Sequence, residues 1–316
     1  MSRPSKRTLL AAALLGLLVP LAVARAEVVQ EFSYQVKDVK PDGRYTVAFS
    51  SRTYDTSGGI PPVLRENFQR LPAGAVIRKD FLKKKFYCDA DALLDDLMFA
   101  PENKIPFARR LDKLSSTIKR VKSRWTKKQL RNAEICARAR LGQGTALVDA
   151  RPLFDQLIPS VFFMFFGKGT RPGAVASIQI IGMPDETTDT VKKLPATVRA
   201  TRVPFVLNFF DEPTAGKYGY KLVLPTGPIA GINISIAEVR AVVKGLTLTK
   251  QRKICPEKKR GRCAKKKVKK TNVFWFTQPT CPPSGKLSFE SFYGYDEPTP
   301  DITKTVELSC PSFRRR

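Results

Sequence analysis

The sequence predicts a mainly β protein, an antiparallel β-sandwich braced by disulfides, with a helical insertion at about residues 89–138. Three observations predict it. Short segments of alternating apolar and polar residues recur between Pro and Gly turns. One stretch between them has helical spacing instead. Six cysteines follow an N-terminal segment that resembles an export signal. With 42% hydrophobic residues, the 316-residue chain has enough apolar material for a large core.

The alternating segments give the strands. Residues 28–36 are expected to pair with 45–49 across the turn Pro41-Asp42-Gly43. The continuous apolar run at 161–166 is typical of a strand buried on both faces. Further strands are expected at 175–181, 196–202, 204–210, 218–224, 230–237 and 240–249, and further hairpins pair 245–254 with 267–277 and 286–295 with 302–309.

The helical insertion is recognised by apolar residues that recur at intervals of three and four, which form one stripe of an amphipathic helix. Thr126 and Gln129 form a capping box that opens a second helix. Asp89 is positioned to cap a short helix through Leu97. The stripe consists of Phe107, Leu111, Leu114, Ile118, Val121 and Trp125.

Residues 1–26 are expected to be a signal peptide, with a cationic start, an apolar run and Ala24-Arg25-Ala26 as the cleavage site. The protein is then secreted, extracellular and associated with the cell envelope. The alternative is an uncleaved signal that anchors it to the membrane. Residues 27–316 are expected to form a single large β-sandwich domain, or alternatively two packed β domains at about 27–185 and 186–316.

Export makes disulfides the default state of the cysteines. Six cysteines allow about 15 pairings, and proximity in the chain favours Cys88–Cys136, Cys255–Cys263 and Cys281–Cys310. By loop entropy the first of these would contribute roughly 4 kcal/mol. No two cysteines have the spacing of a zinc knuckle and the chain has no histidine, so neither a metal nor another cofactor is expected.

The charge balance points to a kind of partner. The chain has 56 Lys plus Arg against 28 Asp plus Glu, which gives a formal charge of +28. The absence of histidine excludes catalytic triads that use imidazole as the base. A cationic surplus favours association with polyanions and says nothing about the fold.

Two regions concentrate this charge. Residues 104–140 contain 13 Lys or Arg, and residues 250–270 contain 12. The sharp interpretation of the first is a surface for a polyanion or an anionic membrane, and the alternative is a solvated helix. The second region is predicted to bind anionic polymer, with cations beside an aromatic residue; the alternative is that its lysines only protect an edge strand from pairing. The predicted binding residues are Lys258, Lys259, Arg260, Arg262, Lys265, Lys266, Lys267 and Trp275.

The leading functional hypothesis is a secreted, non-catalytic envelope protein that binds cell-wall polymer, acidic polysaccharide or extracellular DNA through these basic surfaces. The alternative is a carbohydrate-active hydrolase with a pair of carboxylates in a groove. Its candidate acids are Asp89, Asp91, Asp95, Asp96 and Glu102, together with the adjacent pairs Asp211-Glu212 and Asp296-Glu297. Nothing in their spacing defines a calcium loop or fixes a catalytic geometry.

Several features of residues 130–311 resemble one group of proteins. Cys136 is followed by Gly142-Gln143-Gly144-Thr145-Ala146, then come the Lys-rich hairpin, Cys281-Pro282 and Cys310-Pro311. Together they resemble uncharacterised, exported β-rich proteins of high-GC Gram-positive bacteria. The resemblance implies secretion and a disulfide-braced β architecture, without an activity or site residues. It also implies that Gly142 and Gly144 are turn glycines and not a phosphate cradle.

Overall fold

A computed structural model gives the fold. It describes residues 27–38, 45–59, 62, 64–77, 87–98, 105–151, 153–214, 217–226, 235–244, 247–259, 262–274, 276–277, 281–296 and 298–310. At 213–214 and 247–277 this description is of the backbone alone. The signal segment 1–26 lies outside the described residues.

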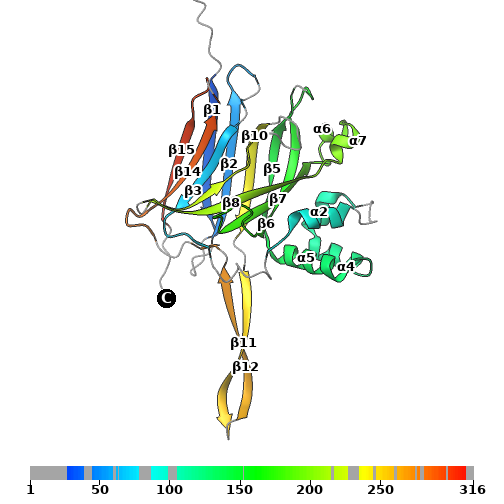
Figure 1. Ribbon diagram of the computed structural model, residues 1–316, viewed down its shortest axis with the longest axis vertical. Coiled ribbons are helices and arrows are strands. Elements are labelled where there is room, and N and C mark those ends of the chain that lie inside the picture. Colours follow the sequence, from blue (N-terminus) through cyan, green and yellow to red (C-terminus); the bar gives the residue numbers. More distant parts are fainter. Residues whose placement is uncertain are drawn as a thin grey trace, which may run out of the picture.

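The described residues form mostly strands, interrupted by two groups of helices (Figure 1). In chain order the elements are β1 (Val28–Lys37), β2 (Thr46–Asp55), β3 (Leu64–Pro72), β4 (Val76–Ile77), α2 (Ala90–Met98), α3 (Phe107–Asp112), α4 (Leu114–Val121), α5 (Lys127–Arg138), β5 (Arg140–Asp149), β6 (Ile158–Gly167), β7 (Ala176–Pro184), α6 (Asp189–Lys192), α7 (Ala196–Arg199), β8 (Val203–Thr214), β9 (Tyr218–Val223), β10 (Ser235–Lys244), β11 (Thr247–Lys259), β12 (Arg262–Phe274), β13 (Phe276–Thr277), β14 (Lys286–Tyr295) and β15 (Ile302–Ser309).

Eleven strands form one antiparallel sheet in the order β1-β2-β10-β5-β6-β7-β8-β9-β3-β14-β15. The edge strands β1 and β15 approach each other, so the sheet curls into a nearly closed, barrel-like wall. The prediction of a mainly antiparallel β fold with a helical insertion is confirmed. The two packed sheets of a sandwich are not found in the described part of the chain, because its long strands outside the β11–β12 hairpin all belong to this single curled sheet.

Side chains join the two edges of the sheet from the inside. The rings of Tyr34 on β1 and Phe289 on β14 stack with their centroids 3.8 Å apart. The hydroxyl groups of Ser51 and Tyr293 lie 2.9 Å apart, and the Tyr295 hydroxyl donates to Gln30 Oε1 at 3.3 Å. Burial raises the pKa of Tyr295 to about 12, so its hydroxyl stays a neutral donor at physiological pH.

Two glycines mark the sharpest bend of this wall. Gly142 and Gly144 lie inside β5, so the prediction that they are turn glycines is wrong. A Cβ added at Gly142 would lie 2.0 Å from the carbonyl oxygen of Val242 on β10, and one at Gly144 would lie 2.4 Å from that of Arg240. The backbones of β5 and β10 therefore approach on the inner side more closely than any side chain allows, as expected where a sheet turns a corner.

The helical insertion has the predicted amphipathic stripe. Phe107, Leu111, Leu114, Ile118 and Val121 are all buried and Trp125 is half-buried. The stripe is divided into α3 and α4 at Lys113 instead of forming one helix. The capping box of Thr126 and Gln129 is confirmed at the start of α5. Asp89 accepts a hydrogen bond from Ala92 N at 3.1 Å, which confirms it as the cap of α2.

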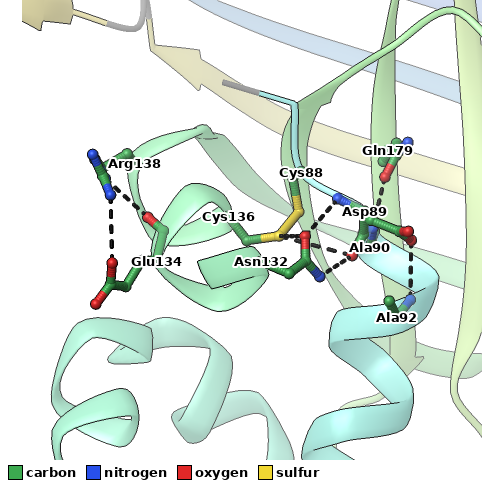
Figure 2. Close-up of a disulfide and its surroundings, with 9 residues drawn as sticks. All are labelled: Cys88, Asp89, Ala90, Ala92, Asn132, Glu134, Cys136, Arg138 and Gln179. Atoms are coloured by element: carbon green, nitrogen blue, oxygen red, sulfur yellow. Dashed lines mark hydrogen bonds and ion pairs between the residues drawn. A yellow bond between two sulfur atoms is a disulfide. The ribbon is translucent and has the colours of Figure 1, made fainter. Parts of the chain in front are cut away.

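The insertion covers the outer face of β6–β8, because α2 packs on β7 and β8 and α3 packs on β6. Figure 2 shows how it is attached: Ala90 N donates to Gln179 Oε1 on β7 at 2.7 Å, and Asn132 on α5 exchanges two hydrogen bonds with the Asp89 backbone. With helices outside and the curled wall inside, residues 162–166 of β6 are buried on both faces as predicted.

Two of the three predicted disulfides are confirmed. Cys88–Cys136 joins the two ends of the insertion (Figure 2), and Cys281–Cys310 joins the segments flanking the last hairpin. The side chains of Cys255 and Cys263 lie outside the described part of the molecule. Disulfides of this kind are typical of proteins in an oxidising, extracellular environment. None of the described helices is long and apolar enough to cross a membrane.

The strand predictions are mostly confirmed, including the hairpins β1–β2, β11–β12 and β14–β15. The strand expected at 196–202 is wrong. These residues hold the short helix α7, which follows Pro195, and Val198 packs on a small apolar cluster with Val191 and Leu194. The two strands expected at 230–237 and 240–249 are, over the described residues, the single strand β10 followed by the start of β11.

Candidate ligand cavity

The curled sheet encloses a cavity of about 860 Å³. Residues from β2, β3, β5–β10 and β14 line it, so it runs through the interior of the fold and is not a cleft on its surface. Ligand sites for small molecules commonly measure about 300–1,000 Å³. The cavity therefore has the size of a site for one lipid-sized molecule.

One wall of the cavity, formed by β5–β8, is apolar. Several of its side chains are only partly buried although they face the interior, because the cavity and not another side chain lies next to them. This differs from a close-packed core, in which such residues would be fully covered. The central residues of this wall are Ala146, Val148, Phe162, Met164, Ile178, Ile180, Phe205 and Leu207.

The opposite wall, formed by β2, β3 and β14, carries a row of uncharged polar side chains that we call the polar row: Ser51, Thr53, Asn67, Gln69 and Tyr293. Ser51 accepts a hydrogen bond from Gln30 Nε2 at 2.8 Å, and Thr53 donates to Gln30 Oε1 at 2.5 Å. Asn67 lies directly across the strand pair from Tyr293. Its Oδ1 is buried without a hydrogen-bond partner among the described residues. Such an atom is costly to leave unpaired.

Charge is nearly absent from the cavity. Among the described residues that line it, Arg171 alone carries a formal charge, and it is exposed in the loop between β6 and β7. Two large apolar side chains that line the cavity are also open to solvent: Leu153 is 56% exposed and Ile236 is 41% exposed. They lie after β5 and at the start of β10, and so mark one end of the cavity as its rim.

The predicted polyanion-binding residues lie elsewhere. Lys258, Lys259, Arg262, Lys265, Lys266 and Lys267 belong to the hairpin β11–β12, a two-stranded sheet of its own that projects from the body (Figure 1). Arg260 and Trp275 lie outside the described residues. The hairpin follows the end of β10, whereas the rim residue Ile236 is near the start of β10. Hairpin and rim are therefore at opposite ends of that strand.

The cations of the helical insertion divide into two kinds. Most are exposed, as the amphipathic prediction requires. Two have structural roles instead: Arg110 is buried and donates to the carbonyl of Leu97 at 2.7 Å, and Arg140 donates to the carbonyl of Asp112 at 2.6 Å. The insertion thus uses part of its charge to hold its own turns together.

The candidate catalytic acids do not meet in the cavity, whose described lining contains no Asp or Glu. Glu212 of the pair Asp211-Glu212 instead forms an ion pair with Arg70, which also binds Glu290. Asp96 accepts a hydrogen bond from Gln129 at 2.7 Å. Burial, with the neighbouring Asp89 and Asp95, raises the pKa of Asp91. Glu102 and Glu297 lie outside the described residues, and the described residues contain no cluster of metal-ligating side chains.

Sequence reasoning missed the cavity residues. Their alternation on β2, β3 and β5–β8 was visible, but a core facing a second sheet has the same alternation. One signal was available in β2, whose inward positions change from Val47 and Phe49 to Ser51 and Thr53 along one face. A purely structural core gives no reason for such a change.

No family model, curated protein or solved structure matches the chain. The resemblance to exported β-rich proteins over residues 130–311 thus stays a prediction. The functional argument depends on the cavity and the charge distribution themselves.

Proposed function

We propose that this protein is an exported, non-catalytic carrier that holds a lipid-sized apolar molecule inside its curled sheet. The cavity of about 860 Å³ with one apolar wall is the observation that supports the proposal. Export is supported by the N-terminal segment and is consistent with the two disulfides. A molecule with little water solubility needs such a container to cross an aqueous compartment.

Packing energetics favour a ligand over a structural void. Natural interiors contain few voids larger than a water molecule, and each Å³ of residual cavity costs about 24 cal/mol. The rest of this protein packs well: Phe165, Phe166, Leu97 and Leu111 are completely buried. A fold that packs this tightly elsewhere would retain a large apolar cavity only if a bound molecule offsets its cost.

Ala146→Trp tests the proposal, because it places a large ring in the middle of the cavity from a position with room around it. We expect the purified protein to bind the neutral dye N-phenyl-1-naphthylamine with micromolar affinity, measured by fluorescence titration. The variant should bind it at least about tenfold more weakly, which corresponds to about 1.4 kcal/mol. Solvent extraction of protein purified from its own cells, followed by mass spectrometry, would identify the natural ligand.

Thr145→Trp is the matched control. Thr145 is the preceding residue of β5 and is exposed on the outer face. It adds the same ring outside the cavity and should leave the dye affinity unchanged. Equal losses in both variants, or no dye binding by the parent protein, would contradict the carrier proposal.

A second function is favoured by the hairpin β11–β12. We propose that it tethers the protein to anionic polymer of the cell envelope through the cationic sequence at 250–270. Its projection from the body in Figure 1 supports this, since an edge-protecting role needs no strand beyond the sheet. Because hairpin and rim lie at opposite ends of β10, a tethered protein keeps its cavity accessible.

The tether makes a separate prediction. Replacing Lys258, Lys259, Arg260 and Arg262 together by Ser should lower the salt concentration that elutes the protein from immobilised anionic polysaccharide, because fewer counterions are released on binding. The matched control replaces the exposed Lys113, Lys119, Lys122 and Lys127 of the helical insertion by Ser. Equal shifts in the two variants would mean that bulk charge alone causes retention. Dye binding should be unchanged in both.

A further inference from the structure

The chemistry of the cavity restricts the class of ligand. We infer that the ligand is an uncharged amphiphile with a long apolar body and a hydrogen-bond donor such as a hydroxyl, and that this donor is bound by the side chain of Asn67. The inference rests on the proposed carrier function and specifies which molecule the carrier selects.

The absence of charge is the first step. The polar row contains amides and hydroxyls only, and the one charged residue of the described lining, Arg171, is exposed at the β6–β7 loop. A charged headgroup placed inside would lose its hydration without a counter-charge, which is strongly unfavourable. Burial also raises the pKa of Tyr34 and of Tyr45, both in the lining, so these phenols remain neutral.

The second step is the division of the interior into two unlike walls. A hydrocarbon body satisfies the apolar wall of β5–β8 but leaves the polar row without partners. Most of that row is occupied within the protein: Ser51, Thr53 and Tyr293 take part in hydrogen bonds that include Gln30. These bonds hold the row in place and leave little capacity for a ligand.

Asn67 is different. Its backbone carbonyl accepts from Leu224 N at 2.9 Å, which fixes the strand, while its side-chain Oδ1 is buried and lacks a partner among the described residues. An acceptor in this state binds a hydroxyl hydrogen and discriminates against an analogue that lacks it. Tyr293 lies across the strand pair from Asn67 and lines the cavity beside it. The position therefore suits the hydroxyl end of an amphiphile whose chain lies along Ile180 and Leu207.

Two matched probes test this inference. Dodecan-1-ol and dodecyl methyl ether share the apolar chain and the oxygen, but only the alcohol donates a hydrogen bond. Displacement of N-phenyl-1-naphthylamine should show that the wild-type protein prefers the alcohol by about three- to tenfold, the range of one hydrogen bond. In Asn67→Leu the preference should disappear while the ether binds at least as well as before. Dodecanoate at pH 8 should bind more weakly than the alcohol to the wild-type protein.

The outcomes separate the inference from the function on which it rests. If the wild-type protein binds alcohol and ether equally well, the role of Asn67 is overturned and the carrier proposal stands. If Asn67→Leu keeps the preference, the donor is recognised elsewhere and the inference is again overturned. If no probe binds, carrier function and inference both fail. The comparison in the wild-type protein decides the matter even if the variant does not fold.

Discussion

Arg70→Met is expected to destabilise the folded protein by about 3 kcal/mol, because it leaves two partly buried carboxylates without their counter-charge. The Arg70 guanidinium binds Glu212 at 2.9 Å and also forms an ion pair with Glu290. The side chains of Arg70, Glu212 and Glu290 are 28%, 22% and 13% exposed. Chemical denaturation followed by circular dichroism would measure the change in the unfolding free energy.

The cluster has this effect because it joins strands that are distant in the chain. Arg70 is on β3, Glu212 on β8 and Glu290 on β14, and the Tyr218 hydroxyl on β9 donates to Glu290 at 2.9 Å. Burial, together with the hydrogen bond to Glu290, raises the pKa of Tyr218 and keeps it a donor. Removing the central cation leaves the carboxylates to repel each other.

Arg65→Met is the matched control, since Arg65 also lies on β3 and pairs with a carboxylate, Asp301, but both partners are largely exposed. Its expected effect is below about 1 kcal/mol. Adding Glu212→Gln and Glu290→Gln to Arg70→Met should recover part of the lost stability, because no buried charge is then left unpaired. Equal effects of the two single Arg substitutions would show that the cluster is an ordinary surface network.

Local features of the fold could be predicted from the sequence because they depend on neighbouring residues. The capping box at Thr126 and Gln129, the buried stripe from Phe107 to Val121 and the disulfide Cys88–Cys136 each follow from spacing within the chain. The error at 196–202 has the same cause. Three β-branched residues resembled a strand, but Pro195 and the packing of Val198 on Val191 and Leu194 favoured a helical turn.

Closure of the sheet could not be predicted, because alternation shows that a strand has an inner face and does not show what that face meets. Val47 and Phe49 have the same pattern whether they pack on a second sheet or face a cavity. The candidate site was missed for this reason. Sequence charge led to the hairpin at 250–270, whereas the cavity contains almost no charge and so leaves little trace in the composition.

The curvature that creates the cavity should depend on Gly142. We expect Gly142→Ala to destabilise the protein by about 3 kcal/mol, because the new methyl group would lie 2.0 Å from the Val242 carbonyl oxygen and 3.2 Å from Met164 Cε. The nearest contact is backbone, so it cannot be relieved by a rotamer change; β5 and β10 must separate. Thermal unfolding measures the loss, and weaker dye binding should accompany it if the bend shapes the cavity.

Gly182→Ala separates this effect from the general consequence of placing a methyl group inside the sheet. Gly182 also lies within a strand, β7, and lines the same cavity, but its nearest neighbour would be the Phe205 ring at 3.3 Å. A ring at the edge of a cavity can turn aside, so we expect a change within about 1 kcal/mol. If both variants are equally stable, close approach of β5 and β10 is not required, and the closed wall must be maintained by the contacts between its edges, Tyr34 with Phe289 and Ser51 with Tyr293.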